Sequence, residues 1–478
     1  MLAAALPLVL GGCRESETGP IEVSAIGAPP RMVNPNREPL DPPSAFLVES
    51  TAQGLVRFDA GGDIEPGLAQ SWIISNDGLR YTFRLGRLRW PDGTRVTAEQ
   101  VVARLRAAAA PTSRNALRPL LGAIDEVDTM TDEVLEVSLK SPRPNFLQLL
   151  AQPEMTILRS GRGIGAFVAE PRPDGSVRLT PPHRPEEEPD EDPAASATPL
   201  VLRGGPAATA VARFALGEAD LVLGGTSADL PFARAAHPRA ASLVFDPAAG
   251  LFGLAFTGRE GLGAAREVRE ALSMAIDRAA LVAALGVPGL QPRQTLLPAG
   301  IEGISAPPPS WANAPTADRR AAAARIVAAA AGPQRPKLRV ALPPGPGSRL
   351  LFAYLRRDWA AIGVDSERVA PGAPADLVLL DEVAPVTLAS WYLRRFACEA
   401  APVCDPKADE AMEAARLAPT AEARRSLLLQ ADGLLAAASP FIALAAPVRW
   451  SLVSPRLTGF RANAFARHPA GELILRAP

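Results

Sequence analysis

The chain has 478 residues, of which 47% are hydrophobic, 21% are charged and 5% are aromatic. That is the composition of a globular protein with roughly two to four domains, large enough to fold without disulfides or metals. Its 50 Lys and Arg against 51 Asp and Glu leave a net charge of −1, which excludes a nucleic-acid-binding protein that relies on a basic surface.

Residues that usually carry catalysis are sparse. The three histidines, His183, His237 and His468, are isolated, and no HExxH motif or close histidine pair occurs. Neither a metal centre nor any other cofactor is therefore predicted. A Gly-x-Ser-x-Gly nucleophile elbow is also absent, and nothing marks a carboxylate pair of the glycosidase kind. We therefore expect a protein that is not an enzyme.

The first residues carry an export signal. Residues 2–12 form an uncharged, mostly apolar run that ends at Cys13. The run is too short for a membrane-spanning helix, which needs about twenty residues, but it matches the hydrophobic region of a secretory signal. Residues 10–13, Leu-Gly-Gly-Cys, resemble a bacterial lipobox. We predict cleavage before Cys13 and attachment of acyl chains at that residue; the alternative is a hydrophobic strand with an incidental Cys.

The next segments show the periodicities of regular elements. Apolar and polar residues alternate at 21–26 and at 81–85, which predicts a strand at each place. Residues 97–100, Thr-Ala-Glu-Gln, have the spacing of a capping box that begins a helix. Residues 124–127 and 134–139 are expected to pair as a hairpin.

The composition changes at 181–199, which holds six acidic residues, six prolines and almost no apolar side chains. Such a segment cannot bury enough apolar surface to offset its ordering entropy, so we predict a disordered loop. Helix and strand signals then alternate. The clearest unit has β-α-β order, at 338–342, 350–362 and 364–369.

Two further cysteines, Cys398 and Cys404, are six residues apart. In an exported chain, two neighbouring thiols in a loop are expected to form a disulfide, and a free buried pair is the alternative. Geometry decides between the two.

Nine short segments form a wider pattern. The first five are GLVRFD at 54–59, IEPGLAQSW at 64–72, NDGLRYTFRL at 76–85, WPDGT at 90–94 and TAEQV at 97–101. In order and spacing they resemble the signature of the family 5 extracellular solute-binding proteins, the peptide- and nickel-type receptors of bacterial ABC importers. The other four follow in the family's order: GIGAF at 163–167, LGEAD at 216–220, VREALSMAIDR at 268–278 and AIGV at 361–364. The resemblance covers nearly the whole chain after Cys13.

This resemblance implies an α/β protein with the two-lobe periplasmic-binding-protein type II fold and an extra α+β subdomain in the first lobe. Such lobes close around a ligand by a hinge motion. The expected parts are a lipoprotein signal at 1–13, a discontinuous lobe I at 20–45, 156–247 and 448–478, the extra subdomain at 46–155, and lobe II at 248–447.

In peptide receptors of this family, a W..DY..P segment supplies ligand contacts. Here only Asp381 and Pro385 of that segment are retained, and the Trp and Tyr are absent. The resemblance places Asp381 as the carboxylate that receives a peptide α-ammonium. Arg394 or Arg395 is expected to meet a ligand carboxylate, and Trp391 or Tyr392 to form an apolar wall. The alternatives are a turn-capping Asp, a solvated arginine pair and two core aromatics.

The function implied is that of an extracytoplasmic receptor. It would bind short peptides or a similar small polar solute and deliver it to the permease subunits of an ABC importer. We expect a periplasmic monomer, anchored to a membrane through lipid on Cys13 and without nucleic-acid contacts. The alternative is a receptor-like sensor or partner-binding module no longer coupled to transport.

Overall fold

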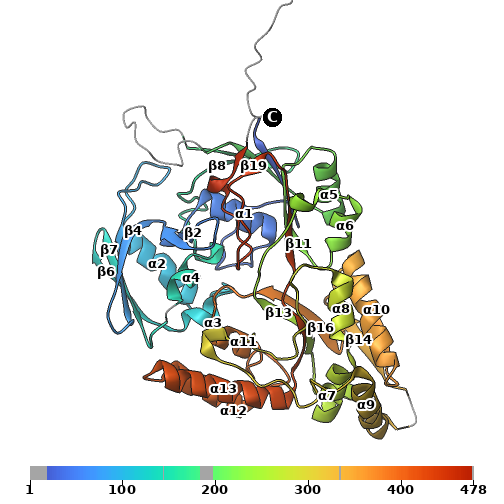
Figure 1. Ribbon diagram of the computed structural model, residues 1–478. Helices are drawn as coiled ribbons and strands as arrows, with labels where there is room; N and C mark the ends of the chain where they lie inside the picture. The colour runs from blue at the N-terminus through green and yellow to red at the C-terminus, as the bar shows by residue number, and fades with distance from the viewer. Residues whose placement is uncertain (1–18, 144, 183–196, 333–334, 476–478) are drawn as a thin grey trace, which may run out of the picture.

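The computed structural model describes residues 19–143, 145–182, 197–332 and 335–475. Within them the chain forms two lobes, each built around its own sheet, with an extra subdomain beside the first lobe (Figure 1). The predicted fold class, a two-lobe α/β protein, is therefore confirmed. The residue boundaries of the lobes stay predictions.

Lobe I is built on a seven-stranded sheet in the order β12-β18-β11-β1-β10-β9-β8. The strand predicted at 21–26 is central and pairs in parallel with both β10 and β11, which explains its buried apolar residues. The strands are β1 (Ile21–Ile26), β8 (Val168–Pro171), β9 (Val177–Thr180), β10 (Leu200–Gly205), β11 (Leu221–Thr226), β12 (Leu243–Phe245) and β18 (Arg449–Val453). The helices are α1 (Pro42–Thr51), α5 (Ala207–Ala215) and α6 (Leu230–Ala235). Residues 46–51 of α1 fall in the range predicted for the extra subdomain, but Phe46 and Leu47 pack in the core of this sheet.

The extra subdomain has a four-stranded antiparallel sheet in the order β4-β5-β7-β6. Its predicted capping box is confirmed: Thr97 Oγ1 accepts the Gln100 N–H at 3.4 Å, and Gln100 Oε1 accepts the Thr97 N–H at 3.3 Å. The predicted hairpin is β6 with β7. The elements are β2 (Val56–Phe58), β3 (Ile64–Pro66), β4 (Ala69–Ile74), β5 (Arg80–Leu85), α2 (Ala98–Ala109), α3 (Arg118–Leu121), β6 (Ile124–Thr131), β7 (Val134–Leu139) and α4 (Phe146–Leu150).

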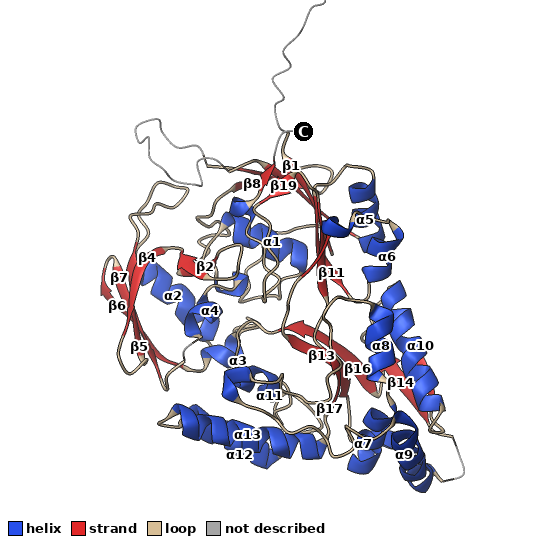
Figure 2. Cartoon of the chain, in the orientation of Figure 1, coloured by secondary structure: helices blue, strands red, loops and turns tan. Residues whose placement is uncertain are grey.

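Lobe II is built on a five-stranded sheet in the order β15-β14-β16-β13-β17, with helices around it (Figure 2). The predicted β-α-β unit is β14-α10-β15, and its strands are parallel. The strands are β13 (Gly250–Phe256), β14 (Lys337–Ala341), β15 (Asp365–Val369), β16 (Leu377–Val383) and β17 (Phe441–Ala445). The helices are α7 (Arg266–Ala275), α8 (Arg278–Leu285), α9 (Thr316–Ala331), α10 (Pro346–Ala360), α11 (Ala389–Arg394), α12 (Pro406–Arg416) and α13 (Ala421–Ala438).

Two segments carry the chain between the main sheets: residues 246–249 join β12 to β13, and residues 446–448 join β17 to β18. The lobes also touch where α6 meets α10. There the Gly347 N–H donates to the Ala228 carbonyl at 2.8 Å. A Cβ on Gly347 would lie 1.9 Å from the Ser227 carbonyl oxygen, so this approach requires glycine.

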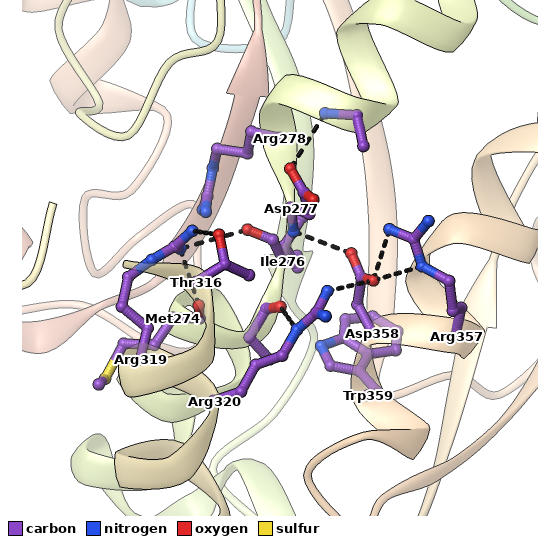
Figure 3. Close-up of polar contacts among 12 residues, drawn as sticks. Met274, Ile276, Asp277, Arg278, Thr316, Arg319, Arg320, Arg357, Asp358 and Trp359 are labelled. Carbon is purple, nitrogen blue, oxygen red and sulfur yellow. Dashed lines mark hydrogen bonds and ion pairs between the residues drawn. The ribbon is translucent and has the colours of Figure 1, made fainter. Parts of the chain in front are cut away.

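A buried carboxylate organises the core of lobe II around the segment 268–278. Asp358 is fully buried, and its Oδ1 accepts from Arg320 Nη2 at 2.5 Å and from Arg357 Nε at 2.7 Å (Figure 3). Its Oδ2 accepts the Asp277 N–H at 2.8 Å. The Asp277 side chain in turn caps α8 by accepting the Ala280 N–H at 3.0 Å.

Two neighbouring arginines donate hydrogen bonds to the carbonyl groups at the end of α7. Arg319 Nη1 donates to the Met274 carbonyl at 2.8 Å, and Arg320 Nε donates to the Ala275 carbonyl at 2.9 Å (Figure 3). A helix C-terminus leaves such carbonyls without intrahelical partners. The most recognisable segment of lobe II is therefore a structural element rather than a ligand contact.

Cys398 and Cys404 lie in the connection between α11 and α12 and are joined by a disulfide. Their Cα atoms are 5.1 Å apart, which is within the usual range for such a bond. The guanidinium of Arg259 also holds this connection, since its Nη2 donates to the Cys404 carbonyl at 3.1 Å.

Two predictions fall on parts of the chain that the structure does not describe. Cys13 lies outside the described residues, and so does most of the acidic segment predicted as a loop, namely 183–196. Among the helices within the described ranges, none is both long enough and apolar enough to span a bilayer.

Asp432 of α13 is a buried acid whose Oδ1 has no hydrogen-bond partner among the described residues, and burial raises its pKa to about 6. An unfolded Asp titrates near about 3.9, so the folded state binds this proton more tightly. Protonation of Asp432 therefore stabilises the folded state. Its contribution to the free energy of unfolding is complete below about pH 3.9 and is lost as the pH rises through about 6. We expect Asp432→Asn to raise the free energy of unfolding at pH 8 by about 1–3 kcal/mol, and to change it little at pH 4.

Urea unfolding at both pH values measures this effect. Glu422→Gln, which changes an exposed acid on the same helix, is the matched control and should be nearly neutral at both. An equal gain at pH 4 and pH 8 would show that the Asp432 side chain acts by packing and not by its charge.

Candidate ligand-binding cleft

A cavity of about 440 Å³ lies where the two lobes and the extra subdomain meet, and we call it the interlobe cleft. Lobe I contributes α1, the end of β11, the start of β18 and residues 465–468, and lobe II contributes 382–385. The extra subdomain contributes Gln152 and Glu154. Large apolar side chains form much of the wall: Phe46, Trp391, Trp450 and Phe465.

The glycine pair at the end of β11 makes room for one of these aromatic rings. Gly225 lies opposite Trp450 in the β11–β18 pair, next to a break in the register. A Cβ on Gly225 would lie 2.2 Å from the Trp450 ring, so the indole packs directly on the strand backbone. The indole Nε1 then donates to the Thr226 carbonyl at 2.8 Å. These contacts hold the Trp450 ring at the cleft wall.

An ion pair joins the lobes beside one of the crossing segments. Arg449 of β18 donates from Nη1 to Asp381 Oδ1 at 2.6 Å, and from Nη2 to the Asp381 carbonyl at 2.8 Å. Both side chains are mostly buried. Arg449 lines the cleft, whereas Asp381 is not among the described lining residues. The carboxylate predicted to receive a ligand ammonium therefore already has a cationic partner within the chain.

Three other acids of the cleft also have basic partners. Glu154 Oε1 lies 3.6 Å from Arg467 Nη2, and Asp246 Oδ2 lies 3.3 Å from His468 Nε2. Glu382 accepts three hydrogen bonds from Arg395: one from Nη2 at 2.8 Å and two from Nε, each at 3.2 Å. The second oxygen of Glu154, Oε2, is buried and has no hydrogen bond within the described ranges.

Glu49 is the acid of the cleft that differs from the others. It projects from α1, and within the described part of the chain it makes no hydrogen bond or ion pair. Burial raises the pKa of Glu49, the nearby Glu154 raises it further, and Arg467 and His468 partly offset these effects. A half-buried carboxylate of this kind is costly unless a cation pairs with it. The Glu49 side chain can therefore bind a cationic group that enters the cleft.

Of the five predicted substrate-binding residues, only Trp391 lies in the cleft wall, and Arg395 reaches the cleft through its bond with Glu382. Tyr392 was predicted as a possible wall, but it is buried in the core of lobe II, with its ring centroid 4.8 Å from that of Trp391. Burial raises the pKa of Tyr392 to about 12. Arg394 lines a second, smaller cavity instead.

The charged residues that sequence reasoning missed come from distant segments. They are Glu49, Glu154, Asp246, Arg449, Arg467 and His468. One local signal was available, because Glu49 is the only charged residue in the otherwise uncharged α1. Within the described residues, no group of three or more His, Cys, Asp and Glu side chains is arranged to hold a metal ion.

Comparison with known proteins identifies the family of this chain and solved structures that share its fold. Residues 63–371 match the family described as bacterial extracellular solute-binding proteins, family 5 Middle. The structure is similar to that of Haemophilus influenzae OppA in complex with RPPGFSPFR, with a TM-score of 0.84 and 18% identity over 96% of this chain and 99% of that one. At this identity the likeness shows the fold.

Sequence relatives align over shorter stretches. The chain is 32% identical over 130 residues to the probable deoxycholate-binding periplasmic protein YgiS of Escherichia coli, covering 23% of this chain and 24% of that protein. It is 32% identical over 126 residues to the nickel-binding periplasmic protein of Escherichia coli, covering 26% of this chain and 24% of that protein. The alignments thus span about a quarter of these relatives.

Proposed function

Because the chain belongs to the bacterial extracellular solute-binding proteins of family 5, we propose that it is the extracytoplasmic receptor of an ABC importer. In this proposal it binds short peptides or a similar small polar solute in the interlobe cleft and delivers it to the permease subunits. The protein is exported to the periplasm, anchored to a membrane by acyl chains on Cys13, and acts as a monomer. Its role is binding and not catalysis.

One observation supports the solute class above the others. The cleft has the size of a small-molecule site, and it offers Glu49, whose carboxylate has no partner among the residues that the structure describes. An ammonium has three donors for such oxygens, and charge-assisted hydrogen bonds of this kind are short and strong. The α-ammonium of a peptide meets these requirements. The aromatic wall then accepts apolar side chains.

Closure is supported by contacts on both sides of the cleft. The Asp381–Arg449 pair joins β16 to β18 beside one crossing segment. Elsewhere in the cleft wall, Gln152 Nε2 donates to the Pro385 carbonyl at 2.7 Å, which joins the extra subdomain to lobe II. We infer that opening of the lobes breaks the second contact, because the crossing segments keep the first side together.

Untargeted mass spectrometry of small molecules released from the natively purified protein tests this proposal. We expect a compound with an amine in near-stoichiometric amount, and calorimetry should then show that it rebinds to the emptied protein. Release of compounds that carry no cationic group, together with no binding of a panel of short peptides, would contradict the proposed solute class.

A further inference from the structure

The second cavity, of about 150 Å³, is distinct from the interlobe cleft and lies between the extra subdomain and lobe II. The lobe II side is formed by Leu388, α11 and α12, and the subdomain side by Pro119, Leu120, Gly122, Ala123, Arg143, Asn145, Phe146 and Leu149. Three arginines line it, Arg143, Arg394 and Arg416, and we call it the arginine cavity.

The charges in this cavity do not balance. Glu413 is the one acid among its described lining residues. It accepts a hydrogen bond from Arg416 Nε at 2.9 Å, and its Oε2 lies 3.9 Å from Arg394 Nη2. One carboxylate thus serves two guanidinium groups. Arg143 has no hydrogen-bond or ion-pair partner for its guanidinium among the residues the structure describes.

Arg143 is also the most buried of the three arginines. It is 9% exposed, and burial, together with repulsion from Arg424, Arg394 and Arg416, lowers its pKa to about 10. Glu302 opposes this shift, but its carboxylate already pairs with Arg424. A buried guanidinium without a counterion is costly. Arg416 adds an Nη1 atom that is buried and has no hydrogen-bond acceptor.

Other groups near the cavity do not supply the missing negative charge. Lys140 adds a further positive charge close to Glu413, and its amine donates to the Gly122 carbonyl at 3.0 Å. Arg424 and Glu302 cancel each other. Among the described residues the cavity therefore keeps a surplus of positive charge, and Arg143 and Arg416 each keep guanidinium donors without an acceptor.

We propose that the arginine cavity binds an oxyanion, a carboxylate or phosphate group, between Arg143 of the extra subdomain and Arg394 and Arg416 of lobe II. Planar guanidinium donors match the two oxygens of such groups. The oxyanion is either a free inorganic ion or an acidic group carried by the bound solute. In both cases it links the two sides of the closed protein.

The extra subdomain and lobe II already contact each other beside the arginine cavity, so an oxyanion bound there would strengthen an existing contact. Asn145 Nδ2 donates to the Thr387 carbonyl at 2.8 Å. Val386 and Leu388 of lobe II pack into the apolar core of the extra subdomain. An ion held by arginines from both sides therefore favours the closed arrangement over the open one.

Thermal unfolding and calorimetry with inorganic phosphate test the proposal, with chloride at equal ionic strength as the reference. Phosphate should raise the Tm of the wild-type protein. Arg143→Gln should abolish that rise and weaken phosphate binding by about tenfold or more.

Two controls accompany this test. In chloride, Arg143→Gln should be at least as stable as wild type, because the substitution removes the unpaired charge, and this result would show that the variant is folded. Arg87→Gln, at an exposed arginine, is the matched control and should respond to phosphate as wild type does.

The outcomes separate the two sources of the oxyanion. A phosphate effect that Arg143→Gln abolishes identifies a free ion as sufficient. If phosphate has no effect, but acidic compounds are released from natively purified wild type and not from Arg143→Gln, the oxyanion belongs to the solute. The proposal is overturned if phosphate stabilises Arg143→Gln as much as wild type, or if neither phosphate nor any acidic compound depends on Arg143.

Discussion

Replacement of Asp358 by Ala is expected to lower the free energy of unfolding by about 3–5 kcal/mol, the range for removal of one partner of a buried ion pair. The carboxylate is fully buried and accepts from two arginines and from the Asp277 N–H. Its loss leaves Arg320 as a mostly buried cation and leaves the N–H before α8 without an acceptor (Figure 3). Both defects lie at the junction of α7, α8 and α10, so lobe II as a whole should be destabilised.

Urea unfolding followed by far-UV circular dichroism and by tryptophan fluorescence measures this loss. Asp365→Ala is the matched control, because Asp365 is exposed and lies 3.8 Å from an exposed Arg335; exposed pairs contribute about 0–1 kcal/mol. The double change of Asp358→Leu with Arg320→Met removes both charges and should be less destabilising than Asp358→Ala. A loss below about 1 kcal/mol for Asp358→Ala would contradict the structural role of this carboxylate.

Replacement of Glu49 by Gln is expected to weaken binding of an amine-bearing solute by about thirtyfold to several thousandfold. This corresponds to the roughly 2–5 kcal/mol lost when one partner of a buried charge pair is removed. The change keeps the shape of the side chain and removes only its charge. Calorimetry with the solute released from the native protein, or with trialanine as a model peptide, measures the effect.

Asp381→Asn is the matched comparison for Glu49→Gln. Asp381 is engaged by Arg449, so we expect a smaller loss of affinity from Asp381→Asn than from Glu49→Gln. The reverse order would show that Asp381 receives the ammonium, as the family resemblance implied, and would remove Glu49 from the site.

The pH dependence of binding provides an independent check on Glu49. Burial raises the pKa of this carboxyl group, so its proton binds at a higher pH than that of an ordinary Glu. Since only the ionised form attracts a cation, affinity should fall on acidification, beginning above the usual Glu range. The decrease should disappear in Glu49→Gln. A decrease of the same size in both proteins would assign the titration to another group.

Short-range patterns were sufficient to predict several elements of this protein. The capping box at Thr97, the β6–β7 hairpin and the β14-α10-β15 unit are each encoded within a few dozen residues, and the structure confirms all three. Their signals are local, because capping depends on a four-residue spacing and burial on a period of two or 3.6 residues. The family pattern likewise identified the fold class from segments that turn out to be structural, such as the cap at Asp277.

The binding residues were harder to predict, and α11 shows why. Successive residues on a helix are about 100° apart, so neighbours in sequence face different surroundings. Trp391 faces the cleft, Tyr392 the core, Arg394 the arginine cavity and Arg395 the carboxylate of Glu382. Residue type alone does not reveal which of these directions faces a ligand.

By itself, then, the sequence determined the class of fold, the local elements and the family, because these depend on spacing within continuous segments. Only the tertiary structure decided which charges meet. Asp381 pairs with Arg449 across 68 positions, and Asp246 with His468 across 222. Among the residues that the structure describes, Glu49 and Arg143 have no such partner, and no local pattern shows that. The physical reason is that a charge becomes available to a ligand only when burial has excluded water and the fold has supplied no counterion.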